Sequence, residues 1–495
     1  MNLHVALFSS ILAIGSGAHP LEPARGKRHF IANLRRQTPA VKLQNGTEPV
    51  FDAGLVRMEV QGLLNKYSMA SDFLNGINLN PDTHPDTGYA PFNDTPIVQY
   101  WANNSKPSSL LTRPRPALSV RGAPAAGAEP ILGLPDEPYA SFELMPLTDD
   151  VADGMDVAYY GALKFGTPAQ ALTVSVDTGS ADLWVPVACP GCSHEQFDAA
   201  ASSTYRNSGR RVSVTYVRRL LSRCADAVLT RWGCRQGAGR VAGTVASDTV
   251  ALGALSVDAQ KFVAVRTESQ DFMDYASSGL LGLAFRSISR MNAPTFFEGL
   301  LAGHKLAAGI FSTHLTRGSA DGSQICFGCF DLTKTTGPVE WLNLTSKTYW
   351  TVTMDGLGAG RNRTAPLNLI AAVDTGSSLI LVADDVAKQF YGLIPGSQDA
   401  SATYGSGFYT YPCSSTVTAS LIFSNRPYSI HKDDMNLGKL SDESEDCVGG
   451  IIGVSSEHGL PANLAIIGDV FLKSWYTTFD YAGSRLGLAP SINNH

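Results

Sequence analysis

Two stretches of this 495-residue chain carry the same pattern, an apolar strand that runs directly into Asp-Thr-Gly-Ser. The motif begins at Asp177 in the first stretch and at Asp374 in the second. About a hundred residues after each motif come two apolar residues and a glycine, at 280–282 and at 466–468. A single Asp-Thr-Gly is more often an ordinary turn, in which glycine supplies a positive φ. A unit that occurs twice, each time with its later partner, predicts two similar lobes.

The chain beyond residue 150 has the pattern of a mainly β protein. Short apolar runs at close spacing are separated by Gly, Asn, Asp and Ser, and residues 173–176 and 212–216 alternate with a period of two. Such runs are typical of half-buried strands. We therefore expect an all-β fold in two lobes, at residues 141–318 and 319–495. Few helices are expected in this body, and within residues 19–140 a helical pattern is present only around residues 55–69.

The composition excludes several classes of protein. Hydrophobic residues make up 44% of the chain, which rules out global disorder. The formal net charge is −6, so the basic surplus of a nucleic-acid-binding protein is missing. No apolar run reaches the 18 residues of a membrane span, and we expect no membrane anchor.

The N-terminus has the pattern of a secretory signal peptide over residues 1–18. Its apolar run, residues 5–14, is followed by small residues, although the usual preceding Lys or Arg is missing. A buried first strand is the alternative. N-glycosylation sequons also favour a secreted protein, with a vacuolar location as the alternative. They stand at Asn45, Asn93, Asn103, Asn343 and Asn362.

Residues 19–140 differ from the rest and are expected to form a pro-segment. Between residues 19 and 70 there are eight basic residues against four acidic ones, whereas from residue 141 onward there are 26 basic against 33 acidic. The later part of the segment is rich in Pro, Asn and Ala and has little periodicity. A basic leader before an acidic body predicts electrostatic docking. A flexible linker with scattered charges is the alternative.

The landmarks of the body stand in the order found in the pepsin-like aspartic peptidases, and the similarity to fungal secreted members runs from about residue 156 to 490. They resemble the start of the mature enzyme (160–170), the first catalytic loop and the strand after it (177–186), the strand behind that loop (279–284), the second catalytic loop (374–377) and the closing stretch (466–471, 479–480). The resemblance implies a bilobal β fold with a cleft between the lobes. It further implies a monomer without cofactor or bound metal, which cleaves polypeptides and is inhibited by its own pro-segment.

Two facing carboxyl groups suit peptide hydrolysis because the reaction needs both a base and an acid. At close range both cannot ionise, so they share one proton and titrate as a pair. Asp177 and Asp374 are therefore expected to hold the lytic water. The ionised member acts as general base and the protonated member polarises the scissile carbonyl.

The neighbours of the two aspartates have matching expected roles. Gly179 and Gly376 let backbone N–H groups approach the carboxylates. The resemblance implies that Thr178 and Thr375 brace the two loops against each other. Ser180 and Ser377 are placed to hydrogen-bond the outer carboxylate oxygens. Other conspicuous aspartates, Asp182, Asp469 and Asp480, are expected to be structural or solvated.

Six cysteines of the body are disulfide candidates. Cys189 and Cys192 bracket a Pro-Gly turn, and Cys326 and Cys329 stand in Cys-Phe-Gly-Cys. Cys413 and Cys447 resemble the usual pair of the C-terminal lobe. A zinc site at the two Cys-x-x-Cys motifs is the alternative, but no histidine stands directly beside any of these cysteines and an oxidising compartment favours disulfides.

The hairpin that closes the cleft in this family, the flap, is interrupted here. The family pattern is a Tyr followed at once by Gly-x-Gly, but Val217 follows Tyr216, and the continuation stands at Gly237-Ala238-Gly239. Between them lie 20 residues, 217–236, with five Arg, one Asp and two Cys. The resemblance implies that Tyr216 caps the cleft and hydrogen-bonds toward Trp184.

The 20-residue segment reads as a translated, unspliced intron. Its removal joins Tyr216 to Gly237 without loss of a residue, and it corresponds to 60 in-frame nucleotides that could begin with GT (Val217) and end with AG (Gln236). A true flap insertion tied by Cys224 and Cys234 is the runner-up, and a nucleic-acid arm is the weakest interpretation. An insertion beside Tyr216 is expected to break the register of the hairpin.

These features together predict a secreted aspartic endopeptidase, made as a zymogen and most active in acid. The alternative is a catalytically impaired peptide-binding protein on the same scaffold, disabled at the flap. An unrelated β-rich carbohydrate-binding protein would require both Asp-Thr-Gly loops to be accidental.

Overall fold

The structure, a computed structural model, describes residues 50–76, 141–152, 154–215, 239–269, 272, 275–455 and 461–494. The expected signal peptide, most of residues 19–140, three sequons (Asn45, Asn93, Asn103), Tyr216, Gly237, Ala238 and the segment 217–236 lie outside this part. Among the described residues, no helix is long and apolar enough to cross a membrane.

The expected all-β fold in two lobes is confirmed. The first lobe contains β2 (Met155–Phe165), β3 (Gln170–Asp177), β4 (Leu183–Pro186), β5 (Arg206–Thr215), β6 (Arg240–Leu252), β7 (Leu255–Glu268) and β8 (Gly279–Gly282), with α5 (Phe296–Ala302) and the 3₁₀ turn η2 (Arg286–Ile288). The core of the second contains β12 (Trp350–Met354), β15 (Leu369–Val373), β16 (Ile380–Ala383), β23 (Ile451–Val454) and β24 (Leu464–Ile467), with α6 (Asp384–Tyr391) and α9 (Asp469–Leu472).

Two small sheets complete the second lobe. One has the strand order β14 (Asn362–Arg363), β13 (Gly356–Ala359), β19 (Ala419–Phe423) and β20 (Arg426–Ser429). The other has the order β17 (Gln398–Asp399), β18 (Tyr409–Pro412), β22 (Asp446–Gly449) and β21 (Asn436–Lys439), with α7 (Ser401–Tyr404) and α8 (Lys432–Met435) beside it in the chain. In this second sheet β21 is an edge strand, paired with β22 on one side.

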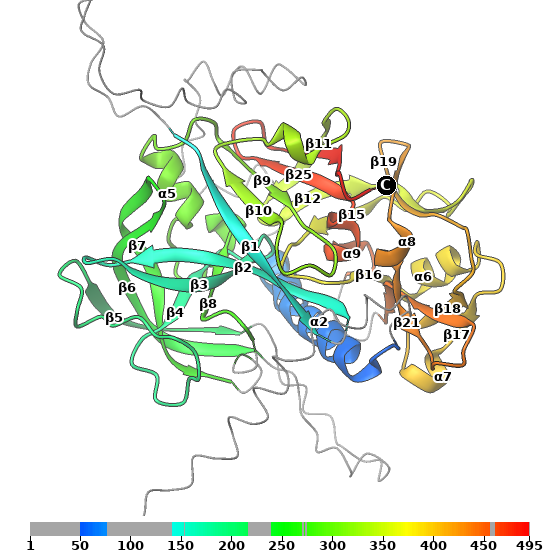
Figure 1. Cartoon of the computed structure of the whole chain (residues 1–495), viewed down its shortest axis with the longest axis horizontal. Helices are drawn as coiled ribbons and strands as arrows, with labels where there is room; N and C mark the ends of the chain where they lie inside the picture. The colour runs from blue at the N-terminus through cyan, green and yellow to red at the C-terminus, as the bar shows by residue number, and fades with distance from the viewer. Residues whose placement is uncertain are drawn as a thin grey trace, which may run out of the picture. The chain divides into compact units, whose positions relative to one another are not determined.

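A run of antiparallel strands joins the lobes (Figure 1). Its order is β1 (Glu143–Ala152), β10 (Ser323–Phe327), β9 (Ile310–His314), β25 (Trp475–Asp480), β26 (Arg485–Pro490) and β11 (Glu340–Lys347). The turn η3 (Leu332–Lys334) lies between β10 and β11. Because the expected boundary at residue 318 falls between the paired strands β9 and β10, this sheet belongs to both halves of the chain.

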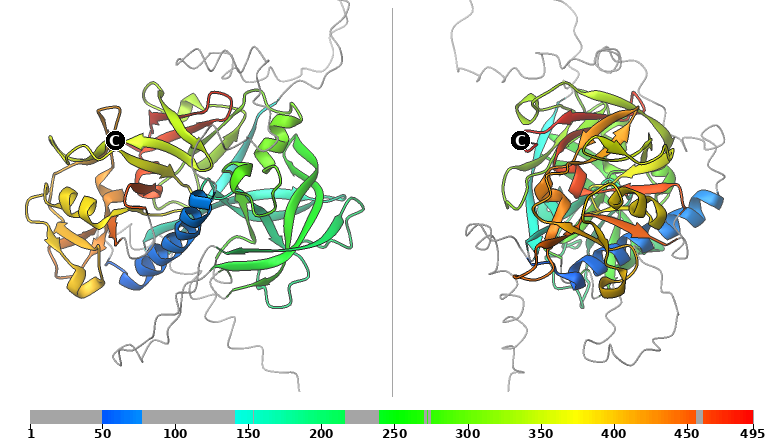
Figure 2. Two further views of the ribbon diagram at one scale, coloured as in Figure 1. Left: turned by 180° about the vertical axis from the view of Figure 1, so that it is seen from behind. Right: turned by 90° about the vertical axis from the view of Figure 1, so that its right-hand side faces the viewer.

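The helical pattern at residues 55–69 is confirmed as α2 (Ala53–Gly76). Asp52 caps it, because its carboxylate accepts hydrogen bonds from the N–H groups of Gly54 (2.7 Å) and Leu55 (3.0 Å). Its buried side chains Val56, Leu63 and Leu64 belong to the main hydrophobic core. Figure 2 shows α2, in blue, crossing between the green strands of the first lobe and the orange and yellow elements of the second.

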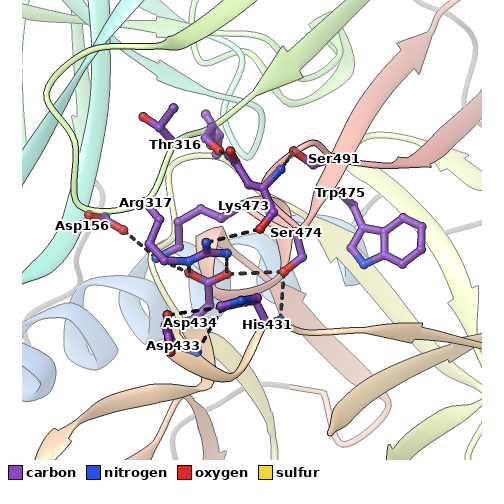
Figure 3. A network of polar contacts seen from close by, with 12 residues as sticks. Asp156, Thr316, Arg317, His431, Asp433, Asp434, Lys473, Ser474, Trp475 and Ser491 are labelled. Carbon is purple, nitrogen blue, oxygen red and sulfur yellow. Dashed lines mark hydrogen bonds and ion pairs between the residues drawn. The ribbon is translucent and has the colours of Figure 1, made fainter. Parts of the chain in front are cut away.

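A buried ionic network ties the first strands of the body to the second lobe (Figure 3). The Lys473 ammonium lies 2.6 Å from Asp156 on β2 and 3.1 Å from Asp434 on α8. Arg317 donates two hydrogen bonds to the same Asp434 carboxylate, at 2.7 and 2.6 Å. Asp149 on β1 is 5% exposed and lies close enough to Asp156 that their charges interact. Burial, followed by the charge of Asp156, raises the pKa of Asp149.

Asp149 is expected to make the fold less stable as the pH rises. Its pKa is higher in the folded than in the unfolded chain, so its stabilising proton is fully present below about pH 4 and is lost as the pH rises toward the folded pKa. The protein with Asp149 should lose free energy of unfolding between pH 4 and pH 7. In Asp149→Asn this loss should be smaller by up to about 4 kcal/mol. Urea unfolding at both pH values measures it, with all variants carrying Asp177→Asn to prevent self-digestion. The exposed Asp321→Asn is the control, and equal pH dependence in all three proteins would contradict the expectation.

Candidate active site

The duplicated motifs occupy equivalent positions in the two lobes. β3 ends at Asp177 and pairs in parallel with β8, so that Asp177 lies opposite Gly282. In the same way β15 ends at Val373, just before Asp374, and pairs in parallel with β24, where Val373 lies opposite Ile467. The two apolar-apolar-Gly stretches therefore lie behind the two Asp-Thr-Gly loops, as the sequence pattern predicts.

Each loop holds its carboxylate in the same way. The Gly179 N–H donates to Asp177 Oδ1 at 2.8 Å, and the Gly376 N–H donates to Asp374 Oδ1 at 2.9 Å. Ser180 Oγ donates to Asp177 Oδ2 at 2.6 Å, and Ser377 Oγ donates to Asp374 Oδ2. A Cβ atom on Gly179 would clash with the Asp374 carboxylate, and one on Gly376 with that of Asp177. Glycine is therefore required in both loops by the close approach of the opposite aspartate.

The two threonines form a reciprocal brace between the lobes. The Thr178 N–H donates to Thr375 Oγ1 at 3.1 Å, and the Thr375 N–H donates to Thr178 Oγ1 at 3.0 Å. Each hydroxyl in turn donates to the strand of the other lobe, Thr178 to the Val373 carbonyl and Thr375 to the Val176 carbonyl, both at 2.9 Å. All four groups are buried, so the brace fixes the spacing of the two aspartates.

Helix α2 places a lysine between the two carboxylates. Lys66 Nζ lies 2.7 Å from Asp177 Oδ1 and 2.8 Å from Asp374 Oδ2, and Tyr67 Oη donates to Asp374 Oδ2 at 2.9 Å. Two turns earlier on the same helix, Glu59 accepts a hydrogen bond from the Ser378 N–H at 3.1 Å. The aspartates are 2% and 0% exposed beneath this helix.

The charges of the site are coupled through Lys66. Burial raises the pKa of Asp177, which the Lys66 ammonium opposes. Burial also acts to raise the pKa of Asp374, but Lys66 and the hydrogen bonds from Asp177, Lys66 and Ser377 hold it below its ordinary value. Burial disfavours the charged form of Lys66, yet the two carboxylates outweigh this and raise its pKa. The one ammonium of Lys66 therefore favours the ionised form of each of the two carboxyl groups.

At the flap, the structure describes the base of the hairpin. The ring of Phe272 contacts both Trp184 on β4 and Gly239. The centres of the Phe272 and Trp184 rings are 5.0 Å apart, and a Cβ atom on Gly239 would clash with the Phe272 ring. β5 and β6 pair without interruption from Arg211↔Thr244 to Thr215↔Arg240, beyond a shift in register between Asn207 and Arg211, and β6 is also held by its long pairing with β7. The place beside Tyr216 at which the insertion is expected to break the register lies outside the described residues.

The other predicted residues are also placed. All three candidate cysteine pairs are disulfide-bonded, Cys189–Cys192, Cys326–Cys329 and Cys413–Cys447, and no cluster of potential metal ligands is found among the described residues. Asn343 and Asn362 are exposed. Asp182, Asp469 and Asp480 are buried and hence structural rather than solvated; for instance, Asp182 accepts hydrogen bonds from Ser289 Oγ at 2.7 Å and from the Arg290 N–H at 2.9 Å.

The sequence did not single out Lys66, Tyr67, Glu59 or Phe272. A signal for the three residues on the helix was present. Glu59, Lys66 and Tyr67 each lie three or four residues from Leu63, within the only helical pattern of residues 19–140, so they share its face. Phe272 follows the strand β7 without any periodic pattern, so nothing local marks it.

Two β lobes that meet at a buried, facing pair of aspartates have the arrangement expected of an aspartic-type endopeptidase. Comparison with known proteins agrees. A family model described as eukaryotic aspartyl protease matches residues 158–491. The chain is 31% identical to major aspartyl peptidase 1 of Cryptococcus neoformans var. grubii, over 68% of this chain and 70% of that protein. It is 31% identical to pepsin A of Rhinolophus ferrumequinum (70% of this chain, 84% of the relative) and 32% identical to cathepsin D of Dictyostelium discoideum (70% and 86%).

The chain belongs to the eukaryotic aspartyl protease family. Its substrates are accordingly polypeptides, and the resemblance drawn from the sequence motifs is confirmed.

Proposed function

We propose that Asp177 and Asp374 are the catalytic dyad of a secreted, or alternatively vacuolar, endopeptidase that is made as a zymogen and works in acid. The observation that carries the proposal is the symmetric pair of buried carboxyl groups, each held by a glycine N–H and a serine hydroxyl of its own loop. In this mechanism the ionised aspartate takes a proton from a water molecule, which attacks the scissile carbonyl. The protonated aspartate donates to the carbonyl oxygen, and the departing nitrogen receives a proton from the dyad.

Helix α2 supports the zymogen part of the proposal. With Lys66 and Tyr67 on the carboxylates, neither a water molecule nor a peptide bond can take the same hydrogen bonds. The charge of Lys66 acts to lower the pKa of both carboxyls, against the burial that raises them. The attraction of Lys66 to the carboxyls is therefore strongest when they are ionised and weakens as acid protonates the pair. Acid would thus both release the pro-segment and favour the singly protonated dyad.

The flap geometry supports the intron hypothesis for residues 217–236. Without them, the last described pair of the hairpin, Thr215↔Arg240, is joined by four residues, Tyr216, Gly237, Ala238 and Gly239. A connection of this length is ordinary for a β-hairpin. Sequencing of the mature transcript tests the hypothesis directly, and a message that retains all 60 nucleotides would refute it.

Deletion of residues 217–236 is expected to raise kcat/KM by about 10²-fold, because a misplaced flap fails to exclude water and to position the substrate. Peptide hydrolysis in acid by the full chain and by the deletion variant measures this. A variant with a Gly-Ser stretch of 20 residues in the same place separates length from composition and should resemble the full chain. Equal activity in all three proteins would show that the segment is neutral. No activity in any of them would favour the peptide-binding alternative.

A further inference from the structure

The chain just before α2 occupies a surface of the second lobe that is separate from the catalytic carboxyls. Val50 forms a parallel β-bridge with Lys439, and the Phe51 N–H donates to the Lys439 carbonyl at 2.7 Å. Lys439 ends β21, which is an edge strand, so residues 50–51 extend that sheet. An edge strand offers free backbone groups to any extended chain that lies beside it.

Side chains make this surface selective. Phe51 is 7% exposed, and its ring packs edge-on against Tyr404 at 5.2 Å and in a tilted arrangement against Phe408 at 6.1 Å. Six residues further on, the Arg57 guanidinium donates to the carbonyls of Tyr404 (2.7 Å) and Thr403 (3.3 Å), where α7 ends. The surface thus combines a backbone edge, an aromatic wall and two carbonyls that accept from a cation. We name the β21 edge, Thr403, Tyr404 and Phe408 the distal surface.

The distal surface has a defined distance from the dyad. The helix from Ala53 to Lys66 spans about 20 Å at 1.5 Å per residue. An extended peptide covers the same distance in about six residues, at roughly 3.3 Å each. Removal of the pro-segment would uncover the Lys439 carbonyl that accepts from the Phe51 N–H and the ring of Tyr404 that packs against Phe51.

We infer that in the mature enzyme the distal surface binds an extended segment of the protein substrate, with an aromatic side chain in the place of Phe51 and a basic side chain near the carbonyls of Thr403 and Tyr404, about six residues from the scissile bond. This inference rests on the proposed function and adds a determinant of substrate choice to it. The occupant seen in the structure supports it, because residues 50–57 already present this chemistry to the surface. The acidic balance of the body, 26 basic against 33 acidic residues, also favours a basic substrate segment.

The test compares peptides that share one cleavable core. A short peptide covers only the core, and two long peptides add a Phe and an Arg about six residues away, one on each side. The acid-activated wild type should cleave one long peptide about five- to tenfold more efficiently than the short one, as one well-packed aromatic contact allows. Tyr404→Ala should abolish this preference with the short peptide unchanged, and Tyr404→Phe should keep it. No preference in the wild type, or an equal loss for both peptides in Tyr404→Ala, would overturn the inference.

A peptide with the sequence of residues 50–57 provides the second measurement. It lacks Lys66 and Tyr67, so it should compete with the long substrate and leave cleavage of the short one unaffected. Equal inhibition of both would place it in the catalytic cleft and overturn the inference, and so would the absence of any binding in fluorescence anisotropy. If the pro-segment stays on the surface after activation, wild-type protein will not bind the peptide, which also counts against the inference. Because the short peptide alone reports the dyad, failure of the proposed function is recognised separately.

Discussion

Asp177→Asn should lower kcat for peptide hydrolysis by at least about 10³-fold with little change in KM, since it removes the group that takes or gives the proton in every turnover. The asparagine keeps the shape of the side chain, and its Oδ1 can still accept from the Gly179 N–H while its Nδ2 donates to Ser180 Oγ in place of the original Oδ2 acceptor. It cannot ionise, so the pair can no longer share one proton between two carboxyl groups. Asp374→Asn should have the same effect, because the two loops are equivalent.

The matched control is Asp321→Asn, a change of the same chemistry at an exposed position. Its kcat should equal that of the wild type. Thermal unfolding of each variant shows whether the fold is intact. Wild-type activity in a folded Asp177→Asn protein would contradict the assignment of the dyad.

Lys66→Ala should open the zymogen at a pH where the wild type is closed. The side chain of Lys66 is 10% exposed, and its ammonium bridges the carboxylates of two aspartates whose side chains are 3% and 0% exposed. Removal of one partner from such a buried arrangement costs about 3–5 kcal/mol. The equilibrium between docked and released α2 should therefore shift by about 10²- to 4 × 10³-fold toward release. The fraction of protein that binds a statine-type inhibitor at pH 6 without prior acid treatment measures this shift.

Two further variants make the result specific. Met58 lies on the same helix and is 47% exposed, so Met58→Ala should leave the zymogen closed. Lys66→Arg keeps the positive charge and should release less than Lys66→Ala. Equal inhibitor binding in Lys66→Ala and the wild type, or equal release in Met58→Ala, would show that Lys66 does not hold the helix.

The site could be predicted to the extent that it is written in repeated local patterns. Asp177 and Asp374 come after apolar strands with a marked partner stretch, and parallel pairing places each motif beside its own partner stretch, however the chain between them is folded. Residues 189–192 and 326–329 likewise close on themselves within one turn. Helix α2 was predictable from its period alone.

The contacts that could not be predicted join residues without a shared pattern. Lys66 reaches Asp177 and Asp374 across 111 and 308 residues, and Arg57 reaches the Tyr404 carbonyl across 347. Periodicity shows that a helix has an apolar face, but not which strands it meets. The network of Lys473, Asp156 and Asp434 is of the same kind, because three single charges far apart in the chain carry no spacing signal.

Acid activation of the variant that lacks residues 217–236 tests the central claim most directly. The variant is brought from neutral pH to acid, and cleavage of an unfolded protein is followed with and without a statine-type inhibitor, whose hydroxyl group takes the place of the lytic water between two carboxyl groups. The mechanism predicts no cleavage before acidification, cleavage after it, and complete block by the inhibitor. Cleavage that the inhibitor does not block, or no cleavage by a folded variant whose α2 has been released, would contradict it.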